Sequence, residues 1–106
     1  MFDLDIYENT YFIFCADNGT AVTAKDRGVE RGVHVPYVVR GPGIKPQGIT
    51  NELTDFSDVA PTLLEMAVIS KSDDLYFDGK SQVPFLTGKT KSQREWIYAY
   101  TGSVQV

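Results

Sequence analysis

Residues 11–19 read Tyr-Phe-Ile-Phe-Cys-Ala-Asp-Asn-Gly, and the change of character within this stretch decides how the chain is interpreted. The first six residues are apolar, aromatic or β-branched and too few for a typical helix, so they predict a buried strand. Asp17 and Asn18 follow where that strand would end, and Gly19 permits a sharp turn. Ligands of parallel α/β sheets bind at the carboxyl ends of strands, and the oxygen atoms of Asp and Asn suit Ca²⁺ or Mg²⁺. Taken alone, these three residues could also form nothing more than a turn.

Later stretches add further elements. Residues 30–43 read Glu-Arg-Gly-Val-His-Val-Pro-Tyr-Val-Val-Arg-Gly-Pro-Gly, which predicts a strand that begins at about Pro36 and ends in a turn. Residues 58–67 predict a core helix, with Asp58 as its N-cap and Pro61 in its first turn. The polar residues 70–74 predict a loop, and residues 94–100 predict another strand.

The order and spacing of these motifs resemble the sulfatase family, within the alkaline-phosphatase-like superfamily. Sulfatases carry a strand ending in Ser-Asp-Asn-Gly, a lysine in a glycine-rich loop, a Glu-Gly-Gly-x-x-x-Pro segment, a strand running into Arg-Gly-Pro-Gly, and an Asp-x-x-Pro-Thr-Leu-Leu helix. Residues 78–88 are similar to a further family stretch, Asp-Gly-x-Ser-x-x-Pro-x-Leu-x-Gly. The resemblance runs from about Glu8 to about Gly102. It implies an α/β fold in which helices pack on a mainly parallel sheet. Because both strands are apolar on both faces and need cover on both sides, we expect residues 11–16 and 36–39 to lie side by side in that sheet, with the helix of residues 58–67 packed on one face.

The resemblance also implies part of an active site. Asp17 and Asn18 match the family's pair of metal ligands, and the metal would be a divalent cation, Ca²⁺. We expect both side chains to point into a solvent-open concavity. Lys25 matches a lysine that contacts the sulfate, although it lies in Ala-Lys-Asp-Arg rather than Gly-Lys-Gly-Thr. A solvated surface lysine is the alternative, and Arg27 is then the nearest substitute. A dication and fixed positive groups are what the growing negative charge of a sulfate ester requires during cleavage.

We expect the remaining candidate groups to be structural. His34, the only histidine, is expected to pack or form a hydrogen bond at the entrance of a strand. Glu30 is expected in a loop, and Arg40 at the start of a surface turn. Cys15 is expected to be a small buried hydrophobe rather than a reactive thiol.

The family's nucleophile is absent from residues 1–106. It is a formylglycine made from Cys or Ser in Cys/Ser-x-Pro/Ala-x-Arg, whereas Cys15 is followed by Ala-Asp-Asn-Gly. We therefore expect a partial catalytic domain, the later half of the large domain, that is inactive alone and belongs to a parent protein that hydrolyses sulfate esters. Two alternatives remain: a fragment of a related phosphodiesterase or phosphoethanolamine transferase, and a non-catalytic fragment that associates with itself.

Composition and charge limit the classes of partner that the chain is expected to bind. The chain has 106 residues, 42% of them hydrophobic and 23% charged, which is ordinary for a folded protein. The net charge of −4 makes nucleic acid an unexpected partner, because nucleic-acid-binding proteins present basic surfaces. A single cysteine excludes an internal disulfide. No apolar stretch is long enough to span a membrane. We recognise no signal peptide in residues 1–106, but a fragment would have lost one, so location stays open; sulfatases are often exported. Bare strand edges and a heavy aromatic load predict a homo-oligomer; the aromatic residues that need cover are Phe12, Phe14, Tyr37, Phe56, Phe85 and Trp96.

Overall fold

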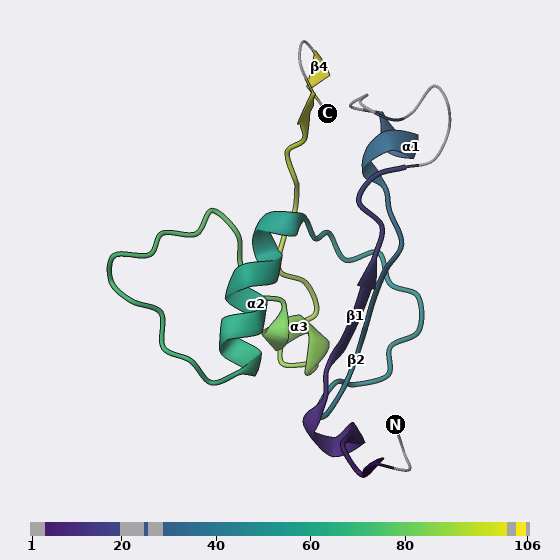
Figure 1. Ribbon diagram of the computed structural model, residues 1–106. Coiled ribbons are helices and arrows are strands. Elements are labelled where there is room, and N and C mark those ends of the chain that lie inside the picture. The colour runs from purple at the N-terminus through teal and green to yellow at the C-terminus, as the bar shows by residue number, and fades with distance from the viewer. Residues whose placement is uncertain (1–3, 20–24, 26–28, 102–103, 106) are drawn as a thin grey trace. The chain divides into compact units, whose positions relative to one another are not determined.

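The computed structural model describes residues 4–19, 25, 29–101 and 104–105 (Figure 1). The chain divides into two compact units. Unit 1 comprises Met1–Gly43 and Tyr98–Val106, and unit 2 comprises Ile44–Ile97. In chain order, the elements of unit 1 are η2 (Tyr7–Asn9), β1 (Phe12–Cys15), α1 (Glu30–Val33), β2 (Tyr37–Arg40), β3 (Tyr100–Thr101) and β4 (Val104–Gln105). Those of unit 2 are η3 (Phe56–Asp58), α2 (Val59–Met66) and α3 (Val83–Leu86).

The two strands predicted to lie side by side do pair, but they run in opposite directions (Figure 1). In the register of β1 with β2, Phe12 lies opposite Arg40 and Cys15 lies opposite Tyr37. β3 and β4 also pair antiparallel, so the mainly parallel sheet expected from the sequence is not found among the described residues. A hydrogen bond of 3.0 Å from Gly19 N to Gly32 O explains the direction. It brings the chain back beside the end of β1, so β2 sets off from that same end.

The strand predicted at residues 11–16 is present but is not buried. Phe12, Phe14 and Val38 are 43%, 63% and 56% exposed. Since side chains alternate along a strand and Phe14 lies opposite Val38, these three occupy one face of the pair. The expectation that Cys15 is buried is also wrong, because this free cysteine is exposed. The apolar residues therefore predicted the extended conformation of this segment correctly, but the prediction that the strand is buried is wrong.

The segment before β2 differs in part from its prediction. β2 begins at Tyr37, one residue after Pro36, as expected. Glu30, expected in a loop, instead begins α1, which is a single helical turn that ends at Val33. His34 closes this turn through a hydrogen bond of 2.8 Å from its N–H to Glu30 O. Residues 20–24 and 26–28 of the predicted loop lie outside the described residues.

Unit 2 contains the predicted helix, α2, which begins at Val59 and ends at Met66. Asp58 does not cap α2 with its side chain. The capping side chain is that of Asp55, which accepts a hydrogen bond of 2.7 Å from Ser57 N at the start of η3. Asp58 completes this capping box by accepting from Asp55 N at 3.3 Å. The packing of the helix on a sheet face stays a prediction.

The rest of unit 2 holds one short helix and irregular segments. Residues 70–74 form no helix or strand, as expected of a loop. Pro84 lies in the first turn of α3, where no intrahelical N–H is needed. The strand predicted at residues 94–100 is wrong except for Tyr100, because Arg94 turns inward to a buried carboxylate instead of entering a ladder. No helix among the described residues is both long and apolar enough to cross a membrane.

Candidate functional site

Asp17 and Asn18 lie directly after β1, where the sequence predicted metal ligands. Ala16 extends the β1–β2 ladder by donating to Pro36 O at 3.3 Å, and the chain then leaves the sheet. Asp17 is exposed and Asn18 is half-buried. Asp17 Oδ1 accepts from Asn18 N at 2.9 Å, while Asn18 Nδ2 donates to Gly19 O at 2.8 Å. These bonds orient both side chains and leave Asp17 Oδ2 and Asn18 Oδ1 as oxygen atoms for a hard cation.

Gly19 is required by close contact with α1. It is buried, and a Cβ at this position would lie 1.6 Å from Arg31 O. Gly19 N donates to Gly32 O at 3.0 Å, so the turn after Asn18 is held against the backbone of α1. The sequence correctly predicted a turn at Gly19, but the physical reason is lack of space for a side chain. We call this contact between Gly19, Arg31 and Gly32 the glycine clasp.

Lys25 belongs to the segment whose two ends the glycine clasp joins. It is exposed and lies in a turn. Gly19 and Gly32 are hydrogen-bonded to each other directly after Asp17 and Asn18. The segment that carries Lys25 therefore begins and ends at the same end of β1. Arg27, the substitute for Lys25, lies outside the described residues.

His34 and Glu30 form a surface pair one helical turn apart. His34 Nδ1 lies 2.8 Å from Glu30 Oε1, and the two side chains are 75% and 80% exposed. An exposed pair of this kind contributes little to stability. The prediction that His34 forms a hydrogen bond is confirmed. Arg40, expected to begin a surface turn, ends β2 and donates through Nε to Tyr7 Oη at 2.9 Å.

The donor set in unit 1 suits a divalent cation but is incomplete. No group of three or more His, Cys, Asp or Glu side chains placed to hold a metal ion occurs among the described residues. Asp17 and Asn18 supply two oxygen ligands, whereas Ca²⁺ takes six to eight. The remaining ligands of a full site would have to come from other segments or from water.

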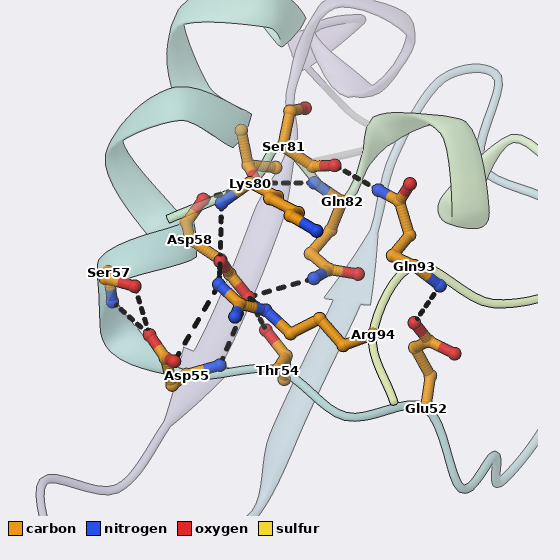
Figure 2. A network of polar contacts seen from close by, with 11 residues as sticks. Glu52, Thr54, Asp55, Ser57, Asp58, Lys80, Ser81, Gln82, Gln93 and Arg94 are labelled. Atoms are coloured by element: carbon orange, nitrogen blue, oxygen red, sulfur yellow. Dashed lines mark hydrogen bonds and ion pairs between the residues drawn. The ribbon is translucent and has the colours of Figure 1, made fainter. Parts of the chain in front are cut away.

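The most elaborate polar cluster lies in unit 2 and centres on Asp58 (Figure 2). The Asp58 side chain is fully buried. Its carboxylate accepts from Lys80 N at 2.7 Å, from Gln82 Nε2 at 2.9 Å, and from both Nε and Nη2 of Arg94. Thr54 Oγ1 donates to the same carboxylate at 3.3 Å. The cluster thus ties the start of α2 to two segments that follow much later in the chain.

These contacts fix the charge state of the cluster. Burial by itself raises the pKa of Asp58, but the hydrogen bonds from Arg94, Lys80 and Gln82 outweigh it and lower the pKa below its usual value. The Asp58 carboxylate in turn raises the pKa of Arg94. Asp58 is therefore an ionised, fully bonded structural group. This agrees with the sequence interpretation of residues 58–67 as core rather than site.

Sequence reasoning missed the partners of Asp58. Arg94 follows it by 36 positions, and nothing in the residues around Arg94 marks the pairing. Thr62 is also fully buried, donates to Asp58 O at 2.6 Å and accepts from Gln82 N at 2.9 Å. The only local signal was a polar Thr on the inward face of an apolar helix.

Comparison with known proteins decides the family. A family model described as Sulfatase matches residues 2–69, which include Asp17, Asn18 and Lys25. The chain belongs to the sulfatase family.

Curated relatives agree with this assignment. The chain is similar to an "Ulvan-active sulfatase" from Formosa agariphila, with 37% identity over 91% of this chain and 19% of that protein. It is similar to human "Arylsulfatase A", with 32% identity over 92% of this chain and 22% of that protein. It is also similar to an "Extracellular sulfatase SULF-1 homolog" from Drosophila melanogaster, with 30% identity over 88% of this chain and 9% of that protein. This sulfatase chain therefore spans about a fifth or less of the relatives it matches.

Proposed function

We propose that residues 1–106 form the later half of a sulfatase catalytic domain and that the complete protein hydrolyses sulfate esters. The observation that carries the proposal is the position of Asp17 and Asn18 immediately after β1, oriented by their own hydrogen bonds. The family assignment and the choice of oxygen ligands support the same function.

In this proposal each side chain near the end of β1 has one role. Asp17 would hold a divalent cation, Ca²⁺, by a charged oxygen, and Asn18 by a neutral one. The cation would supply positive charge to the sulfate oxygens when it is bound. Lys25 would add a fixed ammonium group to the same sulfate, acting as a point charge. Asn18 carries no charge, so the pair neutralises only part of the cation and leaves it attractive to an anion.

The 106-residue chain alone is proposed to be inactive. Sulfate transfer by a sulfatase uses the formylglycine nucleophile, and the residues after Cys15 do not form its precursor motif. Losing the nucleophile and most of the metal ligands removes the reaction rather than slowing it. The missing groups would come from the part of a longer domain that the relatives possess. One relative is described as extracellular, which supports a parent protein that acts outside the cell.

A segment exchange tests the proposed roles. Residues 8–101 of this chain would replace the matching segment of the ulvan-active sulfatase, and sulfate release from ulvan would be measured with Ca²⁺ present. We expect measurable release, a loss of about 10²-fold in Lys25→Ala, and a larger loss in Asp17→Ala. Lys71→Ala and Asp73→Ala remove exposed charges elsewhere and serve as matched controls.

Two results would contradict the proposal. One is a folded chimera, verified by circular dichroism, in which Asp17→Ala keeps the activity of the unsubstituted chimera. The other is cleavage of a phosphodiester in place of a sulfate ester, which would favour the phosphodiesterase alternative.

A further inference from the structure

Asn18 and Gly19 form the one Asn-Gly pair in the sequence, and such a pair is susceptible to spontaneous deamidation. In this reaction the backbone nitrogen that follows an asparagine attacks the carbon of its side-chain amide. Glycine leaves that nitrogen unhindered, because it has no Cβ and adopts conformations that are closed to other residues. Asn9 and Asn51 are followed by Thr and Glu, whose side chains hinder the attack. Asn18 is therefore the asparagine that reacts fastest when the backbone is free.

The reaction consumes one water molecule and releases one ammonia molecule. Gly19 N forms a bond to Asn18 Cγ, the bond from Cγ to Nδ2 breaks, and the proton of Gly19 N leaves with the ammonia. The product is a five-membered succinimide ring. Water then opens the ring at either of its carbonyl groups, which gives aspartate or isoaspartate at position 18.

Both nitrogen atoms of this reaction are held by hydrogen bonds. Gly19 N, the attacking atom, donates to Gly32 O at 3.0 Å. Asn18 Nδ2, the leaving group, donates to Gly19 O at 2.8 Å. Because Gly19 N must give up the proton that it shares with Gly32 O and turn toward Cγ, the attack requires the first of these bonds to break.

The surroundings of Gly19 also oppose the movement that the attack requires. Gly19 is buried, and Arg31 O lies 1.6 Å from the place where a Cβ would be. On the other side of the reacting pair, Asn18 N donates to Asp17 Oδ1 at 2.9 Å. The backbone is thus held before and after the side chain that would react.

We propose that Asn18 is a deamidation site that the glycine clasp suppresses, so that the reaction proceeds from the state in which the clasp is open. The rate in the folded chain is then the rate of a free Asn-Gly pair multiplied by the open fraction. Deamidation adds one negative charge beside Asp17, and the isoaspartate form also adds one atom to the backbone of the turn. The longer backbone displaces Gly19 N from Gly32 O, so the modification keeps the clasp open.

Mass spectrometry of the purified 106-residue chain measures the reaction at each asparagine, because conversion of an amide to a carboxylate changes the mass. The chain is incubated at neutral pH, either folded in buffer or unfolded in guanidinium chloride. A peptide of residues 16–21 gives the rate of a free pair. We expect deamidation at Asn18 to be at least about tenfold slower in the folded chain than in the unfolded chain or the peptide. Asn18→Gln should abolish the signal in all three.

Hydrogen exchange at the Gly19 amide measures the opening of the clasp independently. Exchange and deamidation both need Gly19 N to be released from Gly32 O. The slowing of deamidation in the folded chain should therefore be at least as large as the protection of this amide against exchange, measured by nuclear magnetic resonance of the ¹⁵N-labelled chain. Neither measurement needs a metal ion or sulfatase activity, so this proposal and the proposed function can fail separately.

Two variants separate the clasp from the side chains of α1. Gly32→Pro removes a backbone donor of α1 and disfavours the helical conformation of the residue before it, so the acceptor of Gly19 N is displaced. We expect this variant to speed deamidation at Asn18 at least about fivefold. His34→Ala removes the exposed side-chain pair of α1 without removing a backbone bond and should leave the rate unchanged.

Three outcomes overturn the proposal. The first is an equal rate of deamidation at Asn18 in the folded chain, the unfolded chain and the peptide. The second is a Gly19 amide that exchanges without protection while deamidation at Asn18 is slow. The third is an unchanged rate in a Gly32→Pro variant whose Gly19 amide has lost its protection.

Discussion

Replacing Asp58 by Asn removes one negative charge from the centre of unit 2 while keeping the shape of the side chain. The change removes the nearest carboxylate from the Arg94 guanidinium, whose side chain is 11% exposed, and leaves it only the more distant carboxylate of Asp55, at 3.8 Å. The amide that replaces the carboxylate also has one acceptor oxygen in place of two, so one of the donors on Lys80, Gln82 or Arg94 loses its bond.

The expected destabilisation is large. Breaking a buried ion pair by removing one partner costs about 3–5 kcal/mol, because the other charge stays buried and uncompensated. A domain of ordinary stability has about 5–15 kcal/mol in total. We therefore expect Asp58→Asn to lower the free energy of unfolding by about 4 kcal/mol. With a urea slope of roughly 2 kcal/mol per M, the midpoint would fall by about 2 M.

Urea unfolding followed by circular dichroism at 222 nm measures this change. Asp73→Asn, in the exposed loop after α2, is the matched control and should change stability by less than about 0.5 kcal/mol. The double variant Asp58→Asn/Arg94→Met should recover part of the loss, because it removes the unpaired charge. Equal midpoints for Asp58→Asn and Asp73→Asn would refute the view that this cluster stabilises unit 2.

Further expectations follow from the same structure. The hydrogen bonds from Arg94, Lys80 and Gln82 hold the pKa of Asp58 below the ordinary value of an aspartate, 3.8. Its contribution to stability is therefore complete above that pH and is lost as the pH falls through the lowered pKa. Acid titration of unfolding should show this loss in the parent chain and not in Asp58→Asn. The chain alone should hydrolyse aryl sulfates no faster than buffer, and reproducible metal-dependent turnover would contradict this. Calorimetry should show no micromolar Ca²⁺ binding, and an isotherm that Asp17→Ala abolishes would mean that a complete site is present. Sedimentation equilibrium at tens of micromolar should give species heavier than 11.8 kDa, because Phe12, Phe14 and Val38 form an exposed apolar face, whereas a single 11.8 kDa species would contradict association.

Local sequence patterns predicted the elements of the chain well where short-range physics determines them. The aromatic and β-branched run gave β1, Pro36 marked the start of β2, and the apolar spacing after Asp58 gave α2. Each of these depends on backbone preferences and on neighbours within one or two turns. The candidate ligands Asp17 and Asn18 were found in the same way, since they follow directly from the end of a strand.

Local sequence patterns could not predict contacts between residues that are far apart in the chain. The antiparallel direction of β2 depends on the approach of Gly19 to Gly32. The absence of a strand at Arg94 depends on its ion pair with Asp58, 36 positions earlier in the chain. The exposure of Cys15 could not be predicted from its apolar neighbours, because burial depends on what covers a strand rather than on the strand itself.

The glycine clasp has a consequence for how this part of a sulfatase can vary. Its two ends are fixed by backbone atoms alone, so the identity and number of the residues between Gly19 and Gly32 do not alter the anchor. Doubling the length of a flexible connection adds only about 0.6 kcal/mol of closure entropy. Insertions between the two glycines can therefore reposition a residue such as Lys25 while Asp17 and Asn18 keep their orientation. Because of the clasp, the position of the lysine can change in evolution without a change in the positions of the two oxygen ligands.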